Sequence, residues 1–181
     1  MTDKEILGNI FDAMAGGTDT VNVKRRLSQE FDEILGNDFT KPITNKELDE
    51  LEYCKAVIKE TYRHTPIAVW IGRILYSAIM KRKDYWTDPE KFDPNRFYKI
   101  EESDKYLLEK QHIKNSYTLF DGGIRACPGR KLAIIELKFL LSSIYRKYDI
   151  EMVDQNAPLN YFSDVLTVCK DLMAKVKPRK Y

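Results

Sequence analysis

A single cysteine in a glycine-rich loop, Cys127 within residues 120–129, is the feature of this chain best suited to chemistry. A long apolar segment follows it, where we expect a helix from Arg130 to about Lys147. A helix carries partial positive charge at its N-terminus, so this arrangement favours the anionic sulfur over the neutral thiol. A thiolate placed in this way is suited to ligate iron, and Cys127 is therefore a candidate metal ligand.

The residues around Cys127 suit a flat ligand that carries negative charge. Gly123 and Gly129 keep side chains away, so that a planar macrocycle could approach the backbone. Arg125 offers a planar guanidinium that matches a carboxylate such as a haem propionate, and Phe120 would supply an apolar wall. A lone buried cysteine is more often inert, which is the alternative interpretation. The fixed offsets of the neighbouring residues favour the ligand.

With Phe, Gly, Arg, Cys and Gly at these offsets, the loop resembles the haem loop of the cytochrome P-450 family of haem-thiolate monooxygenases. The resemblance implies haem b, an iron protoporphyrin, bound through the Cys127 thiolate. In such a site the thiolate pushes electron density onto the iron and promotes cleavage of the O–O bond. The resemblance also implies insertion of one atom of O2 into a small, lipophilic organic substrate, with electrons from a flavoprotein or iron–sulfur reductase.

A second stretch, Gly-Gly-Thr-Asp-Thr at residues 16–20, resembles the oxygen-binding motif of the family. The resemblance implies that Asp19 and Thr20 act catalytically by delivering protons. Without the family, the stretch has a simpler interpretation, in which a helix stops at Gly16 and Asp19 caps the next one.

A third motif is the pair Glu60 and Arg63, which lie three residues apart on one face of a predicted helix. Such pairs are common on surfaces and contribute about 0 to 1 kcal/mol there. The resemblance joins them to Arg96, in the irregular proline-containing segment 86–97, as a network that holds the shape of the haem loop. If that network is buried, loss of one partner costs about 3 to 5 kcal/mol.

Hydrophobic periodicity predicts a mainly α fold with small β elements, the α+β class. Helices are expected at residues 23–35, from the capping box Thr44–Glu47 onward, and at 130–147. The last is apolar nearly all round and should be buried. Short strands are expected at 148–153 and 165–168.

The resemblance covers only the carboxyl-terminal portion of a family member, as a single partial domain. Its expected parts are 1–21 (part of the oxygen-binding helix), 22–63 (scaffold helices), 64–119 (meander region), 120–129 (haem-thiolate loop) and 130–181 (proximal helix and terminal strands). Thr20 and Glu60 are only 40 residues apart, and Arg63 and Arg96 only 33, without the usual pair of strands after residue 72. These spacings indicate two internal gaps and a truncated or mis-spliced product.

Composition is that of an ordinary globular domain: 181 residues, 43% hydrophobic and 32% charged. A net charge of +2 argues against nucleic acid as a partner. Three cysteines far apart in the sequence suggest a reducing compartment and argue against zinc. No apolar run reaches membrane-spanning length, so the chain as written is expected to be soluble. Full-length relatives commonly lie at the endoplasmic reticulum membrane, facing the cytosol.

Two hypotheses of different class remain open. In the first, the chain or its parent protein is a monooxygenase, and basic residues such as Arg130 and Lys131 dock an acidic reductase. In the second, the chain is an inactive remnant that keeps the haem loop and acts at most as a haem-binding or interaction fragment. Without a roof over the iron, the dry setting that oxygen activation needs would be lost.

Overall fold

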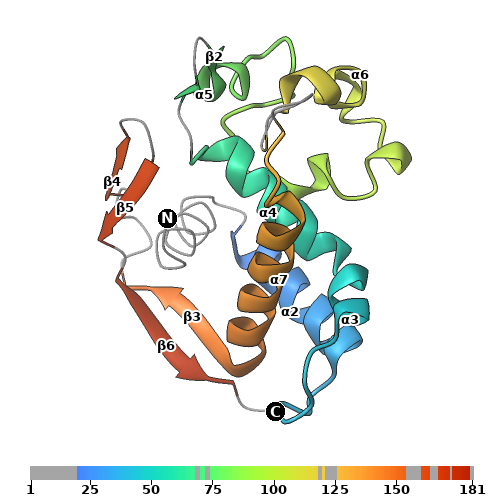
Figure 1. Ribbon diagram of the computed structural model, residues 1–181, viewed down its shortest axis with the longest axis vertical. Helices are drawn as coiled ribbons and strands as arrows, with labels where there is room; N and C mark the ends of the chain where they lie inside the picture. Colours follow the sequence, from blue (N-terminus) through green and yellow to red (C-terminus); the bar gives the residue numbers. More distant parts are fainter. Residues whose placement is uncertain are drawn as a thin grey trace.

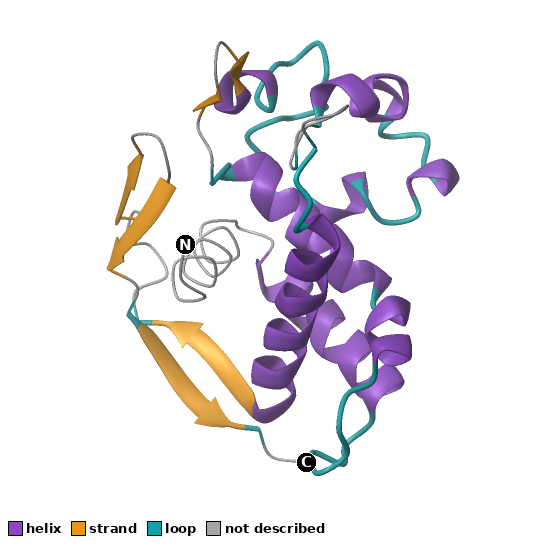
Figure 2. Ribbon diagram, viewed as in Figure 1, coloured by secondary structure: helices purple, strands orange, loops and turns teal. Residues whose placement is uncertain are grey.

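The computed structural model describes residues 20–67, 70–71, 74–117, 120, 126–153, 160–163, 167–171 and 173–179. The fold is mainly helical, with small two-stranded sheets (Figures 1 and 2). The predicted fold class is thus confirmed. No helix in the described part of the chain is both long and apolar enough to cross a membrane.

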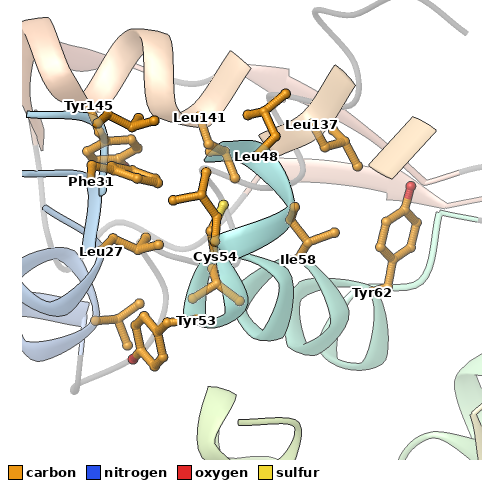
Figure 3. Packing of buried hydrophobic residues seen from close by; sticks show 14 of the residues in the cluster. Leu27, Phe31, Leu48, Tyr53, Cys54, Ile58, Tyr62, Leu137, Leu141 and Tyr145 are labelled. Carbon is orange, nitrogen blue, oxygen red and sulfur yellow. The ribbon is translucent and has the colours of Figure 1, made fainter. Parts of the chain in front are cut away.

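In the described part of the chain, the core is built mainly from four helices. They are α2 (Thr20–Leu35), α3 (Asn45–Glu50), α4 (Glu52–His64) and α7 (Arg130–Lys147), and the first three pack against α7 (Figure 1). On α2 the buried face repeats every four residues, at Val23, Leu27, Phe31 and Leu35, each at most 4% exposed. Figure 3 shows how side chains from α2, α4 and α7 point toward one another. The helix predicted at 23–35 is confirmed and begins at Thr20.

The capping box predicted at Thr44 and Glu47 is confirmed, since each residue accepts a hydrogen bond from the backbone N–H of the other. The helix that follows differs from the prediction, because it breaks at Leu51 into α3 and α4. A carboxylate from another helix explains the break. Glu30 of α2 accepts hydrogen bonds from the backbone N–H groups of Tyr53 (2.6 Å) and Cys54 (2.8 Å), the first-turn donors of α4.

Between α4 and α7 the chain forms short elements and an irregular segment, residues 80–91, which consists of turns and bends. The short elements are β1 (Trp70–Ile71), β2 (Ile74–Leu75), α5 (Tyr76–Ile79), the 3-10 turns η1 (Pro94–Arg96) and η2 (Ile100–Glu102), and α6 (Leu107–Ser116). Figure 1 places α5 and α6 together at the top of the molecule. β1 pairs antiparallel with β2 as a short hairpin, whereas no paired strands were predicted here. Helix α6 was not predicted.

Strands β3 (Tyr148–Met152) and β6 (Ala174–Pro178) pair antiparallel, with Ile150 opposite Val176. Strands β4 (Asn160–Ser163) and β5 (Thr167–Asp171) form a second pair. The strand predicted at 148–153 is confirmed as β3. The one predicted at 165–168 overlaps β5, which begins at Thr167 in the described part of the chain.

The expectation that α7 is buried all round is wrong. Leu137, Leu141 and Tyr145 are at most 3% exposed, whereas Leu132 and Phe139 are 60% and 46% exposed. The reason is that α2, α3 and α4 all pack on the side of α7 that carries Leu137 and Leu141. Apolar side chains on the opposite face, Leu132, Ile135 and Phe139, remain exposed.

Candidate functional site

Glu60, Arg63 and Arg96 form a buried ion-pair network, although their predicted role toward the haem loop remains a prediction. Arg63 and Glu60 come from neighbouring turns of α4, and Arg96 comes from η1. Arg63 donates from Nε to Glu60 Oε2 at 2.7 Å and from Nη2 to Oε1 at 2.9 Å, a bidentate pair. Arg96 Nε donates to Glu60 Oε1 at 3.3 Å. All three side chains are at most 1% exposed.

The Glu60 carboxylate is held by opposing effects. Burial raises its pKa, because a charge loses its hydration inside the protein, and the two guanidinium groups oppose that rise. The backbone N–H of Asp93 adds a further hydrogen bond to Glu60 Oε1 at 2.8 Å. A buried carboxylate between two cations binds both arginines at once and so fixes η1 against α4.

The remaining guanidinium N–H groups bind backbone carbonyls of the irregular segment 80–91. Arg63 donates to the carbonyls of Met80 (3.0 Å), Pro89 (2.7 Å) and Lys91 (3.1 Å). Arg96 donates to the carbonyls of Thr87, Asp88 and Lys91. Buried carbonyls outside a helix or sheet need such donors. The two arginines therefore determine the path of a segment that has no regular structure of its own.

Glu109 is a member of this network that sequence reasoning missed. Its side chain is fully buried in α6 and accepts from Arg96 Nη1 at 2.6 Å. Thr87 binds the same carboxylate twice, from its backbone N–H (2.8 Å) and its hydroxyl (3.1 Å). No local signal could have found Glu109, because nothing in the neighbouring sequence separates this glutamate from exposed ones such as Glu101 and Glu102.

An aromatic cluster of Trp86, Phe97 and Tyr117 lies beside the network. The ring centroids of Phe97 and Tyr117 are 4.9 Å apart, and those of Trp86 and Phe97 are 6.0 Å apart. The Tyr117 hydroxyl donates to the backbone carbonyl of Lys59 on α4 at 3.1 Å. Burial raises the pKa of Tyr117, so its hydroxyl stays protonated as a donor. Tyr117 caps the C-terminus of α6, which is thereby attached to α4 just before the cysteine loop.

Cys127 is a free, exposed thiol that lies two residues before Gly129, the N-cap of the 18-residue helix α7. Its backbone N–H donates to the carbonyl of Phe120 at 2.8 Å. A Cβ atom on Gly129 would lie 3.8 Å from the Cys127 sulfur, so the glycine keeps a side chain away from one side of it. Phe120, Cys127 and Gly129 therefore lie together.

One side chain from α4 and one from α7 lie next to the Phe120 ring. Its ring centroid lies 6.3 Å from that of Tyr62 and 5.9 Å from the guanidinium carbon of Arg130. Burial, with a smaller effect of the nearby Cys127 sulfur, raises the pKa of Tyr62 to about 12. Tyr62 is thus a neutral neighbour of the thiol.

Cys54 provides the contrast to Cys127. It is fully buried in the core, and burial raises the pKa of its thiol far above the ordinary value. Within the described ranges, no group of three or more His, Cys, Asp or Glu side chains could hold a metal ion together.

Several predicted site residues are not placed by the structure. Asp19, Gly123 and Arg125 lie outside the described residues. Thr20 is the first residue of α2. The proximity of Asp19, Thr20 and Arg125 to the cysteine remains a prediction.

Comparison with known proteins decides the family. Residues 1–77 and 73–178 match a family model described as Cytochrome P450. The chain belongs to the cytochrome P450 family. The two matched segments overlap at residues 73–77, a stretch that contains β2 and lies at the second predicted gap.

Three similar curated proteins carry the family name. The chain is 29% identical to the probable cytochrome P450 4d20 of Drosophila melanogaster, across 87% of this chain and 33% of the relative. It is 28% identical to cytochrome P450 4V2 of Mus musculus, across 80% and 30%. It is 39% identical to the cytochrome P450 monooxygenase sttB of Aspergillus terreus, across 53% and 18%. The chain spans about a third of the length of the first two relatives.

Proposed function

We propose that these residues form the haem-thiolate part of a cytochrome P450 in which Cys127 ligates the haem iron. The whole protein is proposed to insert one atom of O2 into an organic substrate. The observation that carries the proposal is the exposed thiol of Cys127 at the start of α7, in a family member. The partial-domain layout proposed from the sequence, with residues 120–129 as the haem-thiolate loop, belongs to the same proposal.

Haem b, when bound, supplies the oxygen-activating chemistry, and the residues of this chain hold and shield it. Cys127 provides the anionic sulfur, and its N–H bond to the Phe120 carbonyl fixes the turn that presents it. Gly129 places no side chain beside the sulfur. The Phe120 ring, which lies against Tyr62, is proposed to exclude water. Gly123 and Arg125 are proposed to let the macrocycle approach and to bind a propionate.

The ion-pair network is proposed to hold the cysteine loop in shape from a distance. Glu60, Arg63 and Arg96 touch neither Cys127 nor Phe120 through any described hydrogen bond. They act through the irregular segment, whose carbonyls they bind, and through the aromatic cluster beside it. Their proposed role is therefore structural support of the ligand.

Proton delivery is assigned to Asp19 and Thr20 on the sequence motif alone. A carboxyl and a hydroxyl next to one another can pass a proton between solvent and a reacting oxygen. Thr20 begins α2, which packs against α7, the helix that follows Cys127.

The proposed electron donor is a flavoprotein or iron–sulfur reductase with an acidic surface. Arg130 and Lys131 are exposed on the first turn of α7, three and four residues after Cys127. Exposed cations near the proposed haem site would steer an acidic partner toward that site. The proposed substrate is a small lipophilic molecule.

The proposal is tested by adding haemin to the purified chain, reducing it and adding carbon monoxide. A thiolate-ligated haem gives a strongly red-shifted absorption band, which we expect for the wild type and for Cys54→Ala, a matched loss of a buried thiol. Cys127→Ala should abolish the band. A spectrum of free or histidine-ligated haem in the wild type, with His64 and His112 as the available ligands, would refute the proposal.

One observation favours a second candidate, an inactive fragment that interacts through its surface. The exposed apolar face of α7, which carries Leu132, Ile135 and Phe139, is the kind of surface that a further protein segment covers. A chain that binds haemin with the thiolate spectrum but oxidises no substrate with a reductase would support this candidate over the enzyme.

A further inference from the structure

Helix α6 connects the buried ion-pair network to the start of the cysteine loop. We propose that Glu109 is a positioning residue for Cys127: its ion pair with Arg96 fixes α6, and α6 fixes the chain that enters the loop. This inference rests on the proposed function and deepens it, because it identifies a further residue on which the thiolate site depends.

The first step is the anchor at the N-terminal half of α6. The Glu109 carboxylate accepts three hydrogen bonds, one from Arg96 and two from Thr87, and its side chain is fully buried. A buried carboxylate is stable only with such partners. Arg96 in turn binds Glu60, so α6 is joined through one guanidinium to α4.

The second step is the anchor at the C-terminal end of α6. The Tyr117 hydroxyl binds the Lys59 carbonyl of α4, and the Tyr117 ring packs against Phe97 and Trp86. Ser116, at the last position of the helix, is fully buried and donates to the carbonyl of His112. The ten-residue helix is thus held against the α4 side of the molecule at both ends.

The third step links α6 to the ligand. Phe120 follows Tyr117 by three residues, and its carbonyl accepts the backbone N–H of Cys127 at 2.8 Å. Its ring lies beside Tyr62 of α4 and Arg130 of α7. A displacement of α6 would move Tyr117 and therefore the carbonyl that orients Cys127. Glu109 acts on the thiol only through this chain of contacts.

The test uses Glu109→Gln, which keeps the shape of the side chain and removes its charge. Glu102→Gln, an exposed glutamate in η2, is the matched control. Amide hydrogen exchange of the haem-free chain is followed by mass spectrometry. We expect exchange to accelerate at least about tenfold in residues 107–117 and at the amide of Cys127. Exchange of the α2 and α7 core should change less than about twofold, and the control should match the wild type.

Two results for Glu109→Gln would overturn the inference. In the first, the exchange rates in residues 107–117 and at Cys127 stay within about twofold of the wild-type rates. In the second, exchange accelerates equally throughout the chain, which indicates a general loss of stability. If Glu109→Gln does not fold, Thr87→Val replaces it, because this change removes one donor and keeps the ion pair. It should then accelerate exchange about two- to fivefold in the same two places only, and the absence of a local change overturns the inference.

A haemin titration provides the second arm. We expect Glu109→Gln to raise the Kd for haemin about tenfold and to lower the fraction of thiolate-type spectrum, with Glu102→Gln unchanged. Failure of the wild type to give that spectrum refutes the proposed function, while the exchange experiment still decides whether Glu109 positions Cys127. An unchanged Kd and spectrum in Glu109→Gln overturns the inference even if exchange accelerates.

Discussion

Neutralising Glu60 should remove much of the stability of this chain. The change Glu60→Gln keeps the size of the side chain and removes the negative charge that faces two buried guanidinium groups. In the wild type the carboxylate accepts hydrogen bonds from Arg63, Arg96 and the backbone of Asp93. The amide offers one oxygen acceptor in place of two, and its NH2 group faces donors.

The magnitude follows from what is left behind. Arg63 loses its only described carboxylate partner and keeps three backbone carbonyls, while Arg96 keeps the Glu109 carboxylate. Breaking a buried ion pair on one side costs about 3 to 5 kcal/mol. Because burial raises the pKa of Glu60, part of the cost of charging it is recovered on neutralisation. We therefore expect the free energy of unfolding to fall by about 3 kcal/mol. That is a large part of the total, which is about 5 to 15 kcal/mol for a typical domain.

The assay is urea denaturation of the haem-free chain at pH 7, followed by circular dichroism. Glu52→Gln is the matched control, since Glu52 is an exposed residue in the first turn of the same helix. It should lose less than about 1 kcal/mol through the helix dipole. A loss below about 1 kcal/mol in Glu60→Gln, with an unchanged dependence on urea, would refute the reasoning that the network is a buried, mutually dependent unit.

Two further predictions concern His64 and the cysteines. Burial, with smaller effects of nearby cations, lowers the pKa of His64 to about 4 from 6.5, so only the unfolded chain binds its proton between these values. The free energy of unfolding should fall by up to about 3 kcal/mol as the pH drops through that window. In urea titrations at several pH values, His64→Gln should lack this part of the fall. The same dependence of the unfolding free energy on pH in the wild type and in His64→Gln would contradict the prediction. Iodoacetamide should modify Cys127 in the folded chain and reach Cys54 only after denaturation, measured in a Cys169→Ala background. Equal rates at the two thiols would show that the core does not protect Cys54.

Features that depend on near neighbours in the chain were predictable from the sequence. The spacing of Val23, Leu27 and Phe31 predicts an amphipathic helix with one buried face, as found. The box at Thr44 and Glu47 predicts a helix start, because the two groups satisfy each other within four residues. The cysteine loop was recognisable because its residue types stand at fixed offsets.

Features that depend on distant contacts were not predictable in this way. Glu30 ends one helix and starts another by binding N–H groups more than 20 residues away. The outer face of α7 is as apolar as the inner one, and only the positions of α2, α3 and α4 decide which of the two is buried. Arg96 came from family resemblance, and Glu109 from the structure alone.

The sequence by itself thus determined the helices at 23–35 and 130–147, the capping box at Thr44 and a thiol at the start of an 18-residue helix, since these follow from spacing within a turn or two. Tertiary structure alone decided which charges became buried partners. Burial of Glu60, Arg96 and Glu109 requires three separate segments to meet, and each ion pair is favourable only when the others are already in place. Such mutual dependence across the chain leaves no pattern in any one segment.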